Sequence, residues 1–273
     1  MNIEQRPTPA RSRRRRLQLL GAILAVGAAL PVASQAQRPA PVPSVTTGDP
    51  ARRDIRVPDT VPNFSGVWLG QTSNRTIPPV DGSSTPFLPW AKAYFDNRAR
   101  AEAAGQPEFD PTANCLPSGV PRVIANGYPL DIVQLPNLMI IGVESGHGYR
   151  VIHMDGKPKP ADLPDSYLGY SVGHWEGETL VVETTGLSPY TQVDEEGRPK
   201  SRDMRVVERY TKRAPDVVEI LFTMYDDRTY SRPWTARSQF KWAPDQRLAE
   251  YICEENNRNR PDNTGRLRHG THK

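Results

Sequence analysis

The chain has 273 residues and a formal net charge of +4 at pH 7, and 37% of its residues are hydrophobic. The first 36 residues carry six of the 35 Lys and Arg residues and one of the 31 Asp and Glu residues, and the 29 basic and 30 acidic residues that remain argue against nucleic acid as a partner. The 28 prolines and 20 glycines exclude a coiled coil and favour short strands joined by turns.

The N-terminus has the features of an export signal in the usual order. An arginine-rich stretch at 11–16 precedes an apolar run at 17–31, and Ser34 and Ala36 supply the small residues that a signal peptidase recognises. This run is shorter than the roughly 20 residues that cross a bilayer, so we expect a cleaved signal peptide at 1–36 and no stable membrane span after processing. The predicted location is periplasmic or secreted, and either the Sec or the twin-arginine route fits the arginines.

The next segment, 37–62, is rich in proline and arginine and has no periodicity, which predicts a disordered tether. A single β-barrel-like domain is expected over 63–255, followed by a flexible basic tail at 256–273. Within the domain, Thr85 is predicted to cap a helix over 86–104 that ends before Gly105. Its apolar face is expected to pack on the core and comprises Phe87, Trp90, Ala91, Tyr94 and Phe95.

The rest of the domain alternates between strand-like segments and turn sequences such as Pro136-Asn137 and Asp155-Gly156. Short connections predict an antiparallel meander, and so many strands would close into a barrel or a strongly bent sheet. The predicted fold is therefore mainly β and lipocalin-like, with one covering helix near the N-terminus. The predicted strands are 64–70, 130–135, 138–144, 148–154, 168–176, 179–185, 204–212, 217–225, 235–242 and 248–253.

Two cysteines, Cys115 and Cys253, follow the leader. In an exported chain an even number of cysteines favours pairing, so we predict a disulfide that joins the proline-rich loop to the last strand. Two buried free thiols are the other interpretation.

Strand periodicity groups the residues that could carry chemistry. Tyr170, His174 and Glu176 share one strand face, and Tyr149 and His153 share another. If both faces line a cavity, the imidazoles and phenols could transfer protons while the carboxylate orients His174. Three arginines are candidate anchors for an anionic substrate group, namely Arg150, Arg205 and Arg209. These polar side chains could instead occupy the solvent face.

The same region contains weaker patterns. Ser171 lies in a GxSxG sequence, but a nucleophile elbow needs a strand before it and a helix after it, and a strand follows here. Two histidines and a carboxylate are also a metal-ligand set, and the candidates are His147, His153 and His174 with Glu144 or Glu176. No nucleotide-binding motif occurs, so we predict no cofactor.

The stretch 171–184, SVGHWEGETLVVET, resembles the signature of a group of exported bacterial β-rich proteins. Further blocks of the chain resemble that group as well: 114–117, 119–122, 207–210, 233–234 and 250–256. The resemblance implies export and a β-rich fold, and it assigns no catalytic role to any residue.

From these observations we expect an exported, cofactor-independent lyase or isomerase that acts by acid–base chemistry on a small hydrophobic or aromatic molecule in a barrel cavity. A non-catalytic periplasmic protein that binds a small ligand is the first alternative, and a metal-dependent enzyme with His and Glu ligands is the second. A third is an envelope interaction protein that uses the basic tail. The sequence indicates no oligomeric state.

Overall fold

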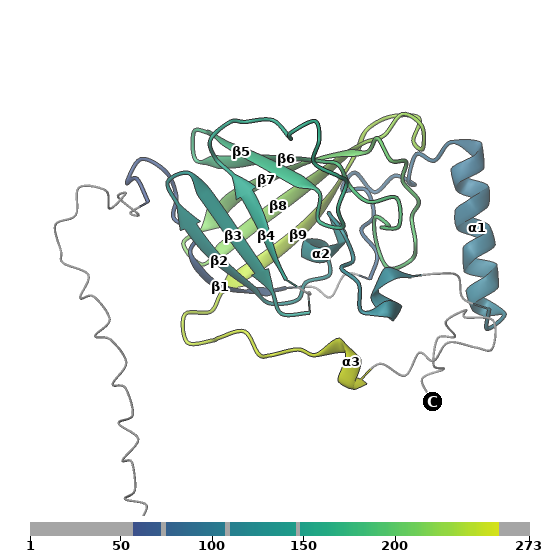
Figure 1. Ribbon diagram of the computed structural model, residues 1–273, viewed down its shortest axis with the longest axis horizontal. Coiled ribbons are helices and arrows are strands. Elements are labelled where there is room, and N and C mark those ends of the chain that lie inside the picture. The colour runs from purple at the N-terminus through teal and green to yellow at the C-terminus, as the bar shows by residue number, and fades with distance from the viewer. Residues whose placement is uncertain (1–56, 72–74, 107–109, 146–147, 257–273) are drawn as a thin grey trace, which may run out of the picture. The chain divides into compact units, whose positions relative to one another are not determined.

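The computed structural model describes residues 57–71, 75–106, 110–145 and 148–256. Nine strands form a closed barrel in which each strand pairs with the next along the chain and β9 pairs back to β1 (Figure 1). The predicted mainly-β barrel is confirmed. The strands are β1 (Gly66–Gly70), β2 (Leu130–Leu135), β3 (Leu138–Val143), β4 (Tyr149–His153), β5 (Tyr170–Glu176), β6 (Thr179–Thr185), β7 (Arg205–Ala214), β8 (Val217–Tyr225) and β9 (Trp234–Trp242).

Three helices and one 3-10 turn accompany the strands in the described part of the chain. They are α1 (Pro89–Ala103), the 3-10 turn η1 (Pro111–Asn114), α2 (Arg122–Ala125) and α3 (Cys253–Asn256). None of the described helices is long and apolar enough to cross a membrane. The predicted signal peptide, most of the predicted tether and almost all of the predicted tail lie outside the described residues.

The meander predicted from the sequence is wrong at one pairing. Strands β4 and β5 run parallel and pair only at Ile152 with Ser171 and at His153 with Val172, whereas the other pairings of described strands are antiparallel. The segment 154–169 makes this possible, because a crossover of a dozen or more residues can return the chain to the end of the barrel where β4 began. The wall of the barrel therefore has one short, weakly paired seam.

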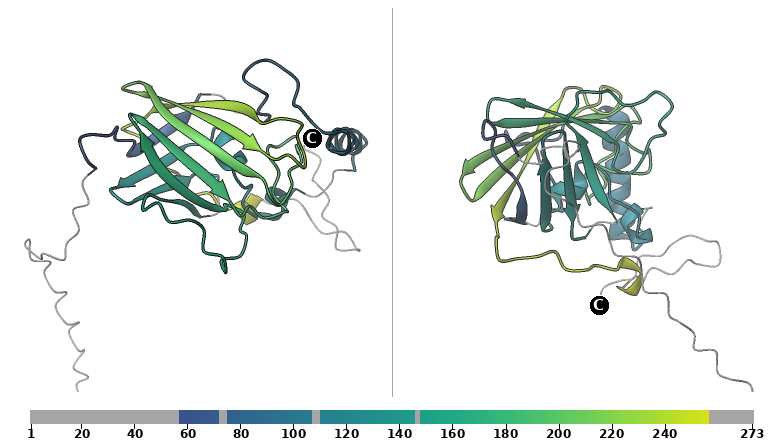
Figure 2. Two further views of the ribbon diagram at one scale, coloured as in Figure 1. Left: turned by 90° about the horizontal axis from the view of Figure 1, so that it is seen from above. Right: turned by 60° about the vertical axis from the view of Figure 1, so that its left-hand side comes forward.

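The strand predicted at 248–253 is also wrong. After β9 the chain runs along the outside of the barrel to α3, and we call residues 243–256 the C-terminal strap (Figure 2). Pairing of β9 with β1 has already closed the barrel, so no strand edge remains for these residues. One hydrogen bond, from the Ala249 backbone N–H to Glu144 Oε2 at 2.9 Å, ties the strap to the turn after β3.

Helix α1 begins at Pro89, three residues later than the sequence predicted, and ends at Ala103. Its start is delayed because Phe87 forms a β-bridge with Tyr230, and the Leu88 backbone N–H donates to the Thr229 carbonyl at 2.8 Å. These contacts hold Phe87 and Leu88 outside the helix, and the backbone of Leu88 is extended. The predicted apolar face is only partly buried, since Ala91 is inaccessible whereas half of the surface of Trp90 is exposed.

The interior of the barrel is packed with side chains. Alternate residues of each strand point inward, and the apolar ones include Trp68, Ile132, Ile141, Ile152, Val182, Ile220, Phe222 and Phe240. Phe64, just before β1, stacks on Trp175 with ring centroids 5.8 Å apart and meets Tyr210 edge-on. Ile124 of α2 joins the same core cluster. A filled interior of this kind is typical of small barrels.

Candidate ligand-binding site

His174 and Glu176 lie on the outer face of β5. Their side chains are 62% and 50% exposed, and His174 Nε2 lies 3.3 Å from Glu176 Oε1. Arg209 Nη2 lies 2.8 Å from the other carboxylate oxygen, and its hydrogen bond, followed by that of His174, lowers the pKa of Glu176. The two residues therefore meet as predicted, but the prediction that this face lines a barrel cavity is wrong.

The opposite face of β5 points into the barrel. There Ser171 Oγ accepts hydrogen bonds from Arg150 Nε at 3.2 Å and Nη2 at 3.0 Å, and it lies 2.9 Å from Thr184 Oγ1. The GxSxG pattern has a packing explanation, because a Cβ at Gly173 would stand 2.9 Å from Ile152 Cγ2. Ser171 is thus a buried hydrogen-bonding residue of a crowded strand rather than an exposed nucleophile.

Arg150 is buried and fully occupied inside the protein. Its Nη1 donates to Glu208 Oε1 at 2.9 Å, and its Nη2 donates to Glu208 Oε2 and to Thr184 Oγ1. Burial alone would lower the pKa of Arg150, but the adjacent Glu208 carboxylate outweighs it and raises that pKa. Burial, with the same carboxylate, also raises the pKa of Tyr210. The prediction that Arg150 anchors an anionic substrate is therefore wrong.

The other two predicted anchors do not join Arg150. Arg205 Nη1 lies 2.9 Å from Glu183 Oε2, and its guanidinium lies 4.0 Å from the centre of the Tyr225 ring. Arg205 and Tyr225 line a separate depression. Arg209 pairs with Glu176 on the outer wall. Both are partly exposed ion-pair partners, and the three arginines do not converge on one site.

The remaining three catalytic candidates do converge. Tyr149, His153 and Tyr170 line a pocket of about 380 Å³ at the seam between β4 and β5, which we call the wall pocket. Its lining is completed by Pro117, Arg150, Val151, Ser166, Tyr167, Leu168 and Gly169. The pocket forms where the two parallel strands are no longer hydrogen-bonded, because pairing is restricted to the two positions at Ile152 and His153.

Aromatic rings dominate this pocket. The imidazole of His153 stacks on the phenol ring of Tyr170, with centroids 4.6 Å apart and an interplanar angle of 14°. Tyr149 is 65% exposed at the rim, and Tyr167 comes from the crossover before β5. Tyrosine side chains that line a pocket are suited to stacking against a flat ring. Sequence reasoning missed Tyr167, because it lies outside any strand and its position depends on the crossover.

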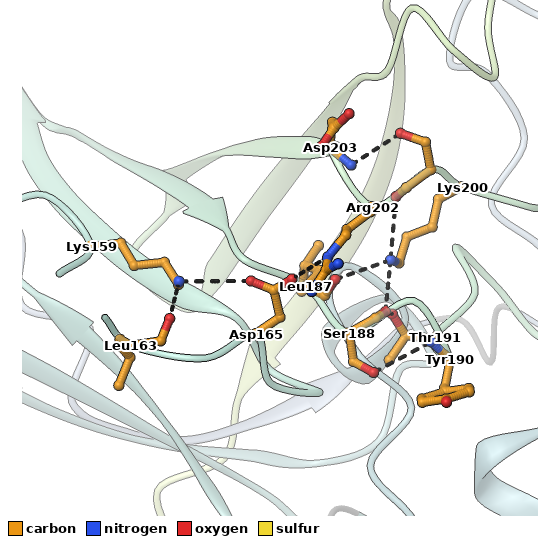
Figure 3. A network of polar contacts seen from close by, with 11 residues as sticks. Lys159, Leu163, Asp165, Leu187, Ser188, Tyr190, Thr191, Lys200, Arg202 and Asp203 are labelled. Carbon is orange, nitrogen blue, oxygen red and sulfur yellow. Dashed lines mark hydrogen bonds and ion pairs between the residues drawn. The ribbon is translucent and has the colours of Figure 1, made fainter. Parts of the chain in front are cut away.

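A polar network holds the crossover in place (Figure 3). The carboxylate of Asp165 receives a 2.8 Å hydrogen bond from Arg202 Nε and lies 3.7 Å from Lys159 Nζ, and the bond from Arg202 is the main reason that the pKa of Asp165 is lowered. The Ser166 backbone N–H donates to the Gly186 carbonyl at 3.0 Å. These contacts fix the segment that carries Tyr167 and leads into Tyr170.

No group of three or more His, Cys, Asp or Glu side chains is placed to hold a metal ion among the described residues. His153 stacks on Tyr170, His174 faces solvent, and Glu144 accepts the hydrogen bond from the strap. His147 lies outside the described residues.

The predicted disulfide is confirmed. Cys115 and Cys253 are joined with a sulfur–sulfur distance of 2.03 Å, and their Cα atoms are 5.6 Å apart. Cys253 begins α3 rather than ending a strand, so the bond joins the loop after η1 to the C-terminal strap. Comparison of the chain with protein-family models, with curated proteins and with solved structures found no match.

Proposed function

We propose that this is an exported, non-catalytic protein that binds a small, uncharged, planar aromatic molecule in the wall pocket. The observation that carries the proposal is the stacked pair of His153 and Tyr170, with Tyr149 and Tyr167 lining the same pocket. Such a lining can stack against a ring, and aromatic pairs contribute roughly 0.5–1.5 kcal/mol beyond the area that they bury.

The charge state of the ligand follows from Arg150. Its guanidinium borders the pocket but already donates to Glu208, Ser171 and Thr184. An anionic ligand would therefore meet no free cation there, and a neutral ring is favoured.

A fluorescence titration with 2-naphthol and with 2-naphthoate tests this proposal. We expect 2-naphthol to bind more tightly, and we expect Tyr170→Ala to weaken its binding about tenfold because the stacking surface is lost. Tyr94→Ala on α1 is the matched control. Tighter binding of 2-naphthoate, or equal binding by the Tyr170 and Tyr94 variants, would contradict the proposal.

Acid–base chemistry as a lyase or isomerase is the second candidate, and the position of His153 in the same pocket favours it. An imidazole beside phenols could remove a proton from a carbon next to a carbonyl and return it at another position. The test is exchange of the α-hydrogens of 2-tetralone in D₂O, followed by NMR. We expect faster exchange than in buffer if the protein is an enzyme, and a loss of about 100-fold in His153→Gln. Exchange at the buffer rate would exclude this candidate for benzylic ketones such as 2-tetralone.

The proposed location is the periplasm or the extracellular medium. Support comes from the order of features in the leader, and a disulfide is typical of oxidising compartments. N-terminal sequencing of the protein from the exported fraction should begin near Gln37. An intact leader on a protein found only in the cytoplasm would contradict this.

A further inference from the structure

Lys212 differs from the other lysines that the structure describes, because its amine has neither a hydrogen bond nor an ion pair. The other described lysines all lie near an oxygen atom: Lys92 is 2.6 Å from Asp96, Lys157 is 3.2 Å from Asp155, Lys159 is 3.7 Å from Asp165, Lys200 is 2.8 Å from the Ser188 carbonyl, and Lys241 is 3.9 Å from Asp216. The amine of Lys212 must therefore be explained by other neighbours.

The neighbours of this amine are aromatic rings. Glu208 and Tyr210 of β7 are buried, and alternation along the strand places Lys212 on their face. Its Nζ lies over the rings of Trp68 and Phe64, 5.5 Å and 5.9 Å from their centres. Lys212 thus has ring faces where the other described lysines have oxygen atoms.

The rings belong to one aromatic group, part of which is open to solvent. Phe64 stacks on Trp175 of β5, and the Trp68 Nε1–H donates to the Phe64 carbonyl at 2.8 Å. Phe64 and Trp68 are buried, whereas Trp175 and Lys212 are partly exposed. Nζ of Lys212 is not among the unpaired polar atoms that the described part of the fold closes to solvent. A molecule from solvent can therefore reach both the amine and the indole of Trp175.

These surroundings favour the neutral form of the amine. Desolvation by burial lowers the pKa of Lys212, and no carboxylate counteracts it. Glu208, on the same face of β7, is already paired with Arg150. An amine that loses hydration without gaining a counter-charge is a better nucleophile, and lysines that form imines with carbonyl compounds are activated in this way.

The electrophile that matches such an amine is an aldehyde. The neutral Nζ adds to the carbonyl carbon and forms a C–N bond. The carbonyl oxygen then takes up the two amine protons and leaves as water, so that a C=N bond joins Nζ to the carbon. An apolar ring on the aldehyde can pack on the exposed part of Trp175, whereas the hydroxyl groups of a sugar would lose hydration beside these rings.

We propose that Lys212 is a covalent binding site for aromatic aldehydes, which it holds as an imine beside the indole of Trp175. This site is independent of the ligand proposed for the wall pocket, which lies at the seam between β4 and β5.

The test treats the folded, disulfide-bonded protein with benzaldehyde and sodium cyanoborohydride, which reduces each imine to a stable amine. Peptide mass spectrometry then measures the rate of modification at each lysine. We expect Lys212 to be modified at least about fivefold faster than Lys241, the exposed lysine of β9. In denaturing urea the two rates should agree within about twofold, because both amines then have their ordinary pKa.

Two further comparisons test the aromatic surroundings. Glyceraldehyde has no ring, so its ratio of the rates at Lys212 and Lys241 should be lower than that of benzaldehyde. Trp175→Leu should lower the benzaldehyde ratio at least about twofold, since the ring that packs on the ligand is lost. His174→Gln, the matched control on the outer face of β5, should leave it unchanged.

The comparison of Lys212 with Lys241 in the wild type needs no variant, so it tests the proposal even if Trp175→Leu folds poorly. Equal rates at these two lysines in the folded protein would overturn the proposal. Fastest modification at Lys200 would also overturn it, because the amine of Lys200 is held by the Ser188 carbonyl rather than by rings. An equal ratio with glyceraldehyde would overturn it as well, since the site would then not recognise an aromatic ring.

Discussion

Arg150 and Glu208 form an ion pair inside the barrel, and their side chains are 1% and 0% exposed. Glu208 also accepts a hydrogen bond from the Tyr210 hydroxyl at 3.2 Å, while Ser171 and Thr184 accept from the guanidinium. Such a pair is costly to bury but costlier to break, because removing one partner leaves an uncompensated charge in the interior.

Glu208→Gln should therefore destabilise the fold by about 3–5 kcal/mol, although it keeps the shape of the side chain. Urea unfolding measures this loss. Glu183→Gln is the matched control, because it removes the partner of Arg205 on the exposed outer wall and should cost less than about 1 kcal/mol. The double variant Arg150→Met/Glu208→Gln should lose less stability than the two single variants added together. Equal losses in Glu208→Gln and Glu183→Gln would contradict the argument.

This ion pair also explains why the site was predicted only in part. Alternation along β5 showed that Tyr170, His174 and Glu176 share a face, and the structure agrees. The alternation of side chains along the strand does not show which face is inside, because both faces of β5 carry polar side chains. A polar network around Arg150 fills the interior, so the face with Ser171 is the buried one.

Most of the strands followed from local patterns, since turn pairs such as Pro136-Asn137 separate alternating segments. The parallel seam did not, because it depends on where the crossover 154–169 returns to the barrel. The segment 248–253 has a strand-like composition but lacks a free edge to pair with. The wall pocket depends on these same long-range features, which explains why Tyr167 was missed.

The disulfide should stabilise the whole barrel. It joins residues 138 apart, and the chain-entropy model gives about 4–5 kcal/mol for closing a loop of that length in the unfolded chain. We expect the double variant Cys115→Ser/Cys253→Ser to lose about 4 kcal/mol in chemical unfolding. Its strap should also be cleaved faster by protease, since the covalent tie at Cys253 is gone and weaker ties such as the hydrogen bond from Ala249 to Glu144 remain. A loss below about 1 kcal/mol would contradict the prediction.

Lys200 should make stability depend on pH in the alkaline range. Its Nζ lies 2.8 Å from the Ser188 carbonyl oxygen (Figure 3), and burial lowers its pKa from 10.5 to about 8 despite the nearby carboxylates of Asp226 and Asp165. Between pH 8 and 10.5 the folded protein has released this proton while the unfolded chain retains it. The free energy of unfolding should therefore rise with pH across that window.

The measurement is the difference in unfolding free energy between the wild type and Lys200→Met as a function of pH. Taking this difference cancels the contributions of all other titrating groups. This difference should shift by about 2–3 kcal/mol in favour of the wild type between pH 8 and 10.5. Lys241→Met on the exposed face of β9 is the control, and its difference from the wild type should stay flat. If the difference between the wild type and Lys200→Met were also independent of pH, burial would not lower the pKa of this amine.

His174→Gln should leave both the fold and the binding of 2-naphthol unchanged. His174 contacts Glu176 on the solvated outer wall, and Arg209 still holds that carboxylate when the imidazole is gone. His153→Gln is the same substitution at another site of the barrel wall. It should weaken the binding of 2-naphthol, because the imidazole ring that stacks on Tyr170 is lost. Parallel thermal unfolding and fluorescence titration of the two variants separate these effects. Weaker binding in His174→Gln, with His153→Gln unaffected, would place the ligand on the outer face of β5 and β6 instead of at the seam.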